Sequence, residues 1–378
     1  MIRSLVAFLA IAFFAQVAFA QPAAGKMRLY VGTYTGPKSK GIYLFDFDPA
    51  TGKLVDAGLV GETADPSFLV FHPTQPFVYA VGEGGKKGTV VALSVDDASG
   101  KLTVLNRQPS GGSGPCYVAI DKAGKHVFTA NYGSGSVECI PIAADGKLMT
   151  PTSVIQDKGS SINPGNQEGP HAHSINLDPS NKFAIAADLG TDMLYVHKFD
   201  PVAGTLTPND PVGTKLKPGS GPRHFAFHPD GKHAFNINEI AMTIVSYRWD
   251  GNKGTLTPIE TVSTLPPNVP GSKKYSTAEV VVHPSGKWVL GSNRTQDSIA
   301  VFAFDAAKEK LTHVGNYSDT VKVPRNFVLD PTGNHVLVGN QDGNSITVFR
   351  FNQATGEMTR VGDPMPCPSP VCLRFRVK

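Results

Sequence analysis

Pro222-Arg-His-Phe-Ala-Phe-His-Pro229 decides the fold, because variants of this stretch recur along the chain at a period of about fifty residues. Each copy starts with Pro or a small residue, alternates through five residues to a turn, and leads into a second apolar run. A third run and a weaker fourth run complete the repeat, and four short strands at this period are typical of a propeller blade. The copies begin at Pro66, Pro115, Ala172, Pro222, Thr277 and Pro324.

The two ends of the chain supply complementary parts of one more repeat. Residues 29–34 and 41–47 match the second and third strands, whereas residues 370–375 match a first strand. Joining them would close a ring and remove exposed sheet edges. The sequence therefore predicts an all-β, seven-bladed β-propeller with four-stranded blades, forming one domain over residues 21–378. The N- and C-terminal strands are expected to share one blade.

Composition agrees with this architecture and narrows the range of partners. The 378 residues include 39 Gly and 30 Pro, as expected for many short strands joined by tight turns. Only 17% of residues are charged, the net charge is +4, and Lys and Arg form no run. We therefore expect neither nucleic acid nor an anionic membrane surface as a partner.

The N-terminus has the pattern of an export signal. Arg3 precedes an almost continuously apolar stretch over residues 5–19, and Ala18-Phe19-Ala20 is a small-x-small cleavage site. We expect a signal peptide over residues 1–20, cleavage after Ala20, and a periplasmic or secreted protein without membrane insertion after cleavage.

Four cysteines invite a search for disulfides, because an oxidising compartment permits them. Cys367 and Cys372 bracket a short Pro-Ser-Pro segment and could close a small loop. Cys116 and Cys139 are expected about two strand spacings apart, which exceeds disulfide reach. The cysteine spacing fits no zinc motif.

The repeat also indicates which residues reach a ligand. The first strand of a blade runs away from one face and the second returns to it, so the start of one and the end of the other share a rim. The first-strand positions are Ser67, Cys116, His173, Arg223, Ala278, Arg325 and Val371. The second-strand ends are Tyr34, Glu83, Tyr132, Leu189, Glu239, Arg294 and Gln341.

This rim gathers charged residues at positions where the rest of the repeat is small or apolar. The catalytic candidates are His173, Arg223, Glu239 and Arg294. The substrate-binding candidates are His171, Glu83, Tyr132, Glu279, Arg325 and Gln341. Strand alternation predicts that His224 points away from Arg223, and it makes the placement of Glu279 less certain.

Most other histidines fit the repeat consensus and are expected to be structural. Three occupy the His-Pro position of the turn between the first and second strands, and three follow the Gly-Lys or Gly-Asn that ends this turn. Both sets therefore lie on the face opposite the rim. They are His72, His228, His283, His126, His233 and His335.

With these residues in place, the chain resembles the bacterial propeller-type 6-phosphogluconolactonases and, more distantly, the fungal carboxy-muconate lactonising enzymes. The resemblance covers residues 28–378 and implies a catalytic His, Arg, Glu and Arg at His173, Arg223, Glu239 and Arg294. It is carried by Gly169-Pro-His-Ala-His-Ser-Ile, Gly221-Pro-Arg-His-Phe-Ala-Phe-His-Pro229, Asn238-Glu239, Ala278-Glu279, Asn293-Arg294 and Val323-Pro-Arg-Asn-Phe327.

The function expected from these observations is lactone hydrolysis without a cofactor or metal, on a small-molecule lactone or sugar acid. Glu239 or His173 would be the general base, and Arg223 with Arg294 would bind the carbonyl oxygen and an anionic group. A cycloisomerase using the same groups and a non-catalytic binding propeller remain alternatives. A calcium-dependent site is disfavoured, because arginines occupy the rim and repel divalent cations. An exported protein would not meet a cytosolic phosphorylated lactone, so the substrate stays open.

Overall fold

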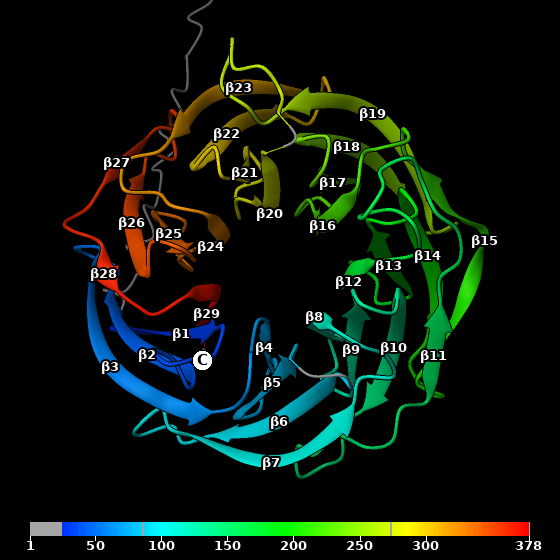
Figure 1. Cartoon of the computed structure of the whole chain (residues 1–378), viewed down its shortest axis with the longest axis horizontal. Coiled ribbons are helices and arrows are strands. Elements are labelled where there is room, and N and C mark those ends of the chain that lie inside the picture. The colour runs from blue at the N-terminus through cyan, green and yellow to red at the C-terminus, as the bar shows by residue number, and fades with distance from the viewer. Residues whose placement is uncertain (1–24, 85–86, 273, 378) are drawn as a thin grey trace, which may run out of the picture.

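The computed structural model describes residues 25–84, 87–272 and 274–377, and it shows a ring of seven β-sheets around a central axis (Figure 1). The innermost strands of neighbouring sheets contact one another all the way around, so the ring is closed. The predicted seven-bladed β-propeller is therefore confirmed. The expected signal peptide lies outside the described residues.

The strands fall into four concentric sets (Figure 1). The innermost strands are β29 (Pro370–Arg376), β4 (Leu69–Phe71), β8 (Pro115–Ile120), β12 (Ala172–Leu177), β16 (Pro222–Phe227), β20 (Ser276–Val282) and β24 (Pro324–Leu329). The second strands are β1 (Met27–Thr33), β5 (Phe77–Gly82), β9 (His126–Asn131), β13 (Phe183–Asp188), β17 (His233–Asn238), β21 (Trp288–Arg294) and β25 (His335–Asn340).

The outer half of each blade is built in the same way. The third strands are β2 (Gly41–Asp48), β6 (Thr89–Val95), β10 (Ser136–Pro141), β14 (Met193–Asp200), β18 (Thr243–Asp250), β22 (Ser298–Asp305) and β26 (Ser345–Phe351). The outermost strands are β3 (Lys53–Glu62), β7 (Leu102–Pro109), β11 (Ser153–Gln156), β15 (Thr205–Lys215), β19 (Thr255–Ser263), β23 (Lys310–Tyr317) and β27 (Met358–Arg360). A short extra strand, β28 (Met365–Pro366), also pairs with β26.

The two ends of the chain close the ring within one sheet. Its strand order is β29-β1-β2-β3, and β29 pairs antiparallel with β1, with Tyr30 opposite Arg374. The C-terminal strand is thus the innermost strand of the blade that begins with β1, as the complementary end repeats predict.

The core lies between the blades. Second strands such as β9, β13, β17 and β25 are buried along their whole length, because a neighbouring blade covers each face of the sheet. Phe128 of β9, for example, packs edge-to-face against Phe199 of the next blade, with ring centroids 4.9 Å apart. The outermost strands are mostly exposed or half-buried, since one of their faces meets water.

All four cysteines are buried and free, so the disulfide that the sequence left open between Cys367 and Cys372 is not formed in this structure. Closeness in sequence does not bring their sulfurs together, because the two side chains pack into different hydrophobic clusters. The Cys372 sulfur instead accepts a hydrogen bond from the Leu69 amide at 3.3 Å. In the part of the chain that the structure describes, no helix has the length and hydropathy needed to cross a bilayer.

Candidate active site

The two sets of rim residues meet at one mouth of the channel, and backbone hydrogen bonds hold them together. In most blades, the backbone N–H of the residue at the end of the second strand donates to a backbone carbonyl at the start of the first strand. That carbonyl belongs to the residue two places before the first-strand rim position. Glu239 N donates to Gly221 O at 2.7 Å, and Tyr132 N donates to Gly114 O at 2.8 Å. The same bond joins Tyr34 to Ser369, Glu83 to Asp65, Leu189 to His171 and Gln341 to Val323. The shared rim predicted from the repeat is therefore present.

A β-bulge sits at the start of the innermost strand in most blades. Pairing shifts register between Pro222 and His224, leaving Arg223 as the extra residue, and likewise between Pro324 and Asn326. Matching shifts occur at Cys116, at His173 and at Ala278 with Glu279. Bulges re-aim side chains and are common beside active sites. Here they turn the first-strand candidates toward the mouth.

An ion-paired group of two arginines and one glutamate forms the centre of the mouth. Oε2 of Glu239 accepts a hydrogen bond from Nε of Arg223 at 2.8 Å and forms an ion pair with Arg294, whose Nη2 lies 2.9 Å away. The side chain of Arg223 is only 2% exposed, against 22% for Glu239. Backbone carbonyls fix the guanidiniums further, since Arg223 Nη1 donates to Ala278 O at 2.7 Å and Arg294 Nε to Thr277 O at 3.2 Å.

Burial and mutual charge set the protonation states of this group. Burial, together with the nearby guanidiniums of Arg325 and Arg294, lowers the pKa of Arg223 to about 10. Burial alone would raise the pKa of Glu239, but Arg294 and Arg223 outweigh it, so this pKa lies below its ordinary value. At neutral pH the mouth therefore holds an ionised carboxylate between two cations.

A second layer of polar residues supports Arg223 from beneath. Nη1 of Arg223 lies 3.1 Å from Nε2 of His224, and Nδ1 of His224 donates to Oε1 of Glu279 at 2.8 Å. Oε2 of Glu279 accepts a hydrogen bond from the Asn326 amide. Because Arg223 can only donate, Nε2 of His224 is the unprotonated nitrogen, and the imidazole is neutral.

This layer corrects the expectation that His224 points away from Arg223. Strict alternation assumes one residue per pleat, whereas the bulge at Arg223 inserts an extra one, so both side chains face the channel. The structure also places Glu279, whose position the strand pattern left open. Its side chain is buried beneath the mouth, where it contacts His224 and Asn326 and thereby positions Arg223.

Tyr34, Glu83 and Arg325 occupy the other side of the mouth. The Tyr34 hydroxyl donates to Oε2 of Glu83 at 3.0 Å, and the Arg325 guanidinium lies 5.4 Å from the centroid of the Tyr34 ring. Among the described residues, none accepts a hydrogen bond from this guanidinium or places a carboxylate oxygen within 4.0 Å of it. Val323, two residues before Arg325, has a φ of 48°, which is a strained conformation for a β-branched residue. Arg325 is thus a cation available to an anionic ligand.

The two histidines of the Pro-His-Ala-His segment have different environments. Nδ1 of His171 donates to the Tyr132 carbonyl at 2.7 Å, and its ring stacks on Tyr132 with centroids 4.5 Å apart. His173 is 4% exposed and lies against Cys116, with Nδ1 3.5 Å from the sulfur. Burial, followed by the charge of Arg223, holds the pKa of His173 well below its ordinary value, so its imidazole is neutral.

Gln341 is the candidate that the structure does not bring into this group. Its amide donates to the Asp342 carboxylate at 3.2 Å, at the exposed end of β25.

A cavity of about 620 Å³ opens beside Glu239 and Arg294, large enough for a sugar-sized ligand. Two loops and the turn between β17 and β18 form its other walls, supplying Asn163, Asn166, Met242, Ser272, Lys274 and Tyr275. The repeat did not single out these residues, because they lie outside the repeated strands.

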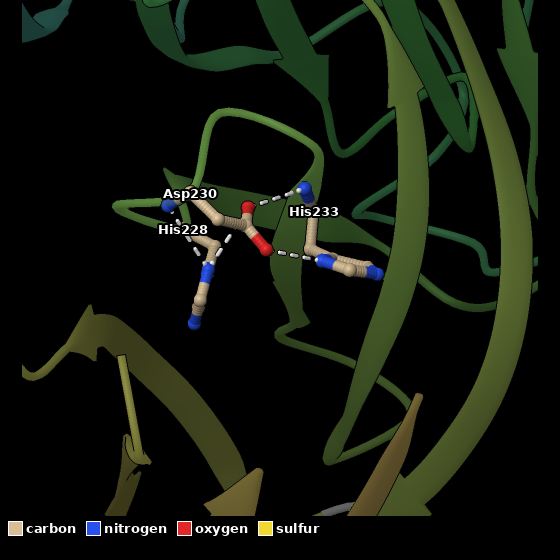
Figure 2. A group of neighbouring side chains, drawn as sticks. All are labelled: His228, Asp230 and His233. Atoms are coloured by element: carbon tan, nitrogen blue, oxygen red, sulfur yellow. Dashed lines mark hydrogen bonds and ion pairs between the residues drawn. The ribbon is translucent and has the colours of Figure 1, made fainter. Parts of the chain in front are cut away.

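A histidine cluster on the opposite face is the group best placed to hold a metal. His228, Asp230 and His233 each offer a ligand atom, all within 4.8 Å of one another (Figure 2). However, Nε2 of His228 donates to Gly286 O and Nδ1 accepts from the Asp230 amide, and His72 and His283 make equivalent bonds in other blades. The repeated turn therefore accounts for this geometry.

Fold and site together define a seven-bladed β-propeller with an arginine-rich polar centre at one mouth of its channel. The chain belongs to the seven-bladed β-propeller lactonase family, whose model matches residues 28–375.

Its relatives include the 6-phosphogluconolactonase of Bacillus subtilis, which is 34% identical over 299 residues, 79% of this chain and 84% of that protein. Among solved structures, the periplasmic gluconolactonase PpgL of Pseudomonas aeruginosa is 30% identical, with a TM-score of 0.87, covering 93% of this chain and 99% of that one. A Bacteroides fragilis protein provisionally designated a 6-phosphogluconolactonase is 36% identical, with a TM-score of 0.88, covering 95% of this chain and all of that one.

Proposed function

We propose that the protein is an exported lactonase that opens a sugar lactone to the corresponding hydroxy acid. The observation that carries this proposal is the Arg223–Glu239–Arg294 group at the channel mouth, in which Glu239 and Arg294 line a sugar-sized cavity. The names of the relatives support the reaction class. The N-terminal export pattern and the periplasmic relative support action outside the cytosol, on a lactone found there.

Glu239 is the better candidate for the general base. Its Oε2 contacts both arginines, while Oε1 makes no hydrogen bond within the described chain and belongs to a residue that lines the cavity. His173 is almost fully buried, and its Nδ1 faces the Cys116 sulfur, so it is less able to reach a water molecule beside the substrate. We assign His173 to the packing that holds Tyr132 and His224 in place.

The proposed step is attack by water on the lactone carbonyl carbon. Glu239 takes a proton from the water as the new C–O bond forms, and guanidinium N–H groups of Arg223 and Arg294 stabilise the oxyanion. Nη2 of Arg223 and Nη1 of Arg294 are free for this, since neither donates to another described residue. The ring C–O bond then breaks, the departing oxygen takes the proton from Glu239, and the product carboxylate ionises beside the arginines.

Steady-state hydrolysis of δ- and γ-aldonolactones by the purified protein tests this proposal. Glu239→Gln should lower kcat ~10²–10⁴-fold, and Arg294→Gln ~10²–10³-fold, as for loss of a base and of an oxyanion donor. Glu309→Gln is the matched control, because it also breaks an Arg–Glu pair, with Arg248, at the other end of β17. Full turnover by Glu239→Gln would refute the role of Glu239. Absence of turnover on every lactone, with ligand-dependent thermal stabilisation, would instead favour a binding propeller.

A further inference from the structure

The opposite mouth of the channel contains a second cavity, of about 530 Å³. The far ends of β4, β8, β12, β16 and β29 line it, and the turns that follow three of these strands form its rim. Phe68 belongs both to this cavity and to a small space of about 10 Å³ beneath Arg223, which has room for about one water molecule. The second cavity shares no lining residue with the cavity beside Glu239 and Arg294, so it does not belong to the proposed catalytic site.

Arg374 places an available positive charge in this second cavity. Its Nη1 donates to Leu373 O at 2.7 Å, and its guanidinium lies 4.4 Å from the centroid of the Phe68 ring. Within the described chain, Nε and Nη2 of Arg374 find no acceptor, and no carboxylate lies within 4.0 Å. Glu279 interacts with Arg374 only through Asn326, whose Oδ1 lies 3.4 Å from Nη1. One edge of the guanidinium thus remains free for two parallel hydrogen bonds, the geometry that a carboxylate prefers.

A second donor lies in the wall of the same cavity. Oδ1 of Asn176 accepts a hydrogen bond from the Tyr117 hydroxyl at 2.8 Å, but Nδ2 of Asn176 is buried and has no partner in the described chain. A buried donor without a partner is costly, and such groups call for an explanation. A modest rotation about χ2, which is a soft torsion in Asn, would aim this N–H into the cavity.

Lys122, Asp178 and His228 also line the cavity, at its rim, where each bonds to backbone atoms. The other walls are apolar and determine the rest of the ligand. Val70, Ala119, Leu177 and Phe227 face the cavity, so a polyhydroxylated sugar acid would lose hydrogen bonds to water there without replacement. We propose that this mouth binds a small aromatic carboxylate, whose carboxylate pairs with Arg374 and Asn176 and whose ring packs on the apolar wall.

The test is a titration with 4-fluorobenzoate followed by ¹⁹F NMR, with the neutral 4-fluorobenzyl alcohol as the matched ligand. Arg374→Met keeps an apolar stem over Phe68 and removes the charge, and it should weaken binding at least ~10-fold, as for loss of a charge-assisted pair. Asn176→Leu should weaken binding several-fold. The control is Arg107→Met, which removes an exposed cation from the outermost strand β7 and should leave 4-fluorobenzoate binding unchanged. Arg325→Met removes the free cation of the other mouth and shows whether the ligand binds there instead.

Ala119→Phe, which fills the cavity without touching Arg374, provides a second test should Arg374→Met fold poorly; it should abolish binding. The proposal is overturned if 4-fluorobenzoate does not bind at millimolar concentration, if the alcohol binds equally well, or if Ala119→Phe binds normally. Loss of binding in Arg325→Met but not in Arg374→Met would place the carboxylate at the catalytic mouth and would also overturn it. None of these outcomes depends on lactone turnover.

Discussion

Replacing Glu138 with Gln is expected to stabilise the protein, and to do so more strongly as the pH rises. Glu138 lies on β10, is 0% exposed, and receives one hydrogen bond, from the Thr129 hydroxyl to Oε1 at 3.1 Å. Its Oε2 is buried without a partner in the described chain. Burial therefore raises the pKa of Glu138 to about 8, with only a small opposing effect from Thr129.

The magnitude follows from the pKa values of the folded and unfolded states. The unfolded value is 4.5, so the stability associated with protonated Glu138 is fully present below pH 4.5 and is lost as the pH rises through about 8. One pKa unit corresponds to about 1.4 kcal/mol, which gives a loss of about 3 kcal/mol at pH 7 and about 5 kcal/mol above pH 8. Gln has nearly the shape of the protonated acid and stays neutral, so Glu138→Gln should escape this loss.

Urea unfolding of both proteins near pH 5, 7 and 9 measures the effect. The difference in the free energy of unfolding should be about 1 kcal/mol at the lowest pH and increase to several kcal/mol at the highest. The exposed Glu357→Gln serves as a control and should show no such increase. A difference that does not change with pH, or a Glu138→Gln protein less stable than wild type near pH 9, would refute the reasoning.

Three further predictions concern the mouth of the channel. After subtraction of spontaneous lactone hydrolysis, kcat should stay constant across neutral pH. In acid it should fall only below the ordinary carboxyl range, because the pKa of Glu239 is lowered. In alkali it should fall near pH 10, where Arg223 loses its proton. Glu279→Gln should lower kcat roughly 10-fold with little change in KM, because the new amide opposes a donor of His224 or Asn326; a changed KM with normal kcat would contradict the positioning role. Arg325→Gln should raise KM about 10-fold for lactones carrying a carboxylate or phosphate but not for neutral ones, which parallel initial-rate measurements would detect.

The sequence predicted the ring correctly because propeller geometry depends on features that repeat. The alternating strands, the turns and the complementary ends each recur in register, so the count of seven blades and the shared terminal blade needed no knowledge of side-chain packing. The rim followed from strand direction alone. That is why Arg223, Glu239 and Arg294, which lie in two different blades, could be expected at one mouth.

Features that do not repeat could not be predicted in this way. The cavity walls at Asn163 and Lys274 come from loops whose conformation depends on contacts peculiar to those loops. The state of Cys367 and Cys372 could not be predicted for a similar reason, because the distance between two side chains in a folded blade is not set by their separation in sequence. The structure has both as free thiols.

The error at His224 has a more general cause, since a bulge changes the parity of a strand without altering its sequence pattern. The residue after each first-strand position is Phe68, Tyr117, Ser174, His224, Glu279, Asn326 or Cys372. Three consecutive blades thus place His, Glu and Asn at a slot that would face a dry interblade core if the strand alternated strictly. Buried polar groups are retained only when they are hydrogen-bonded, so such a run is itself evidence that the slot faces the channel. The His224–Glu279–Asn326 chain beneath Arg223 satisfies that requirement, and it links the positioning of the proposed catalytic arginine to residues contributed by three blades.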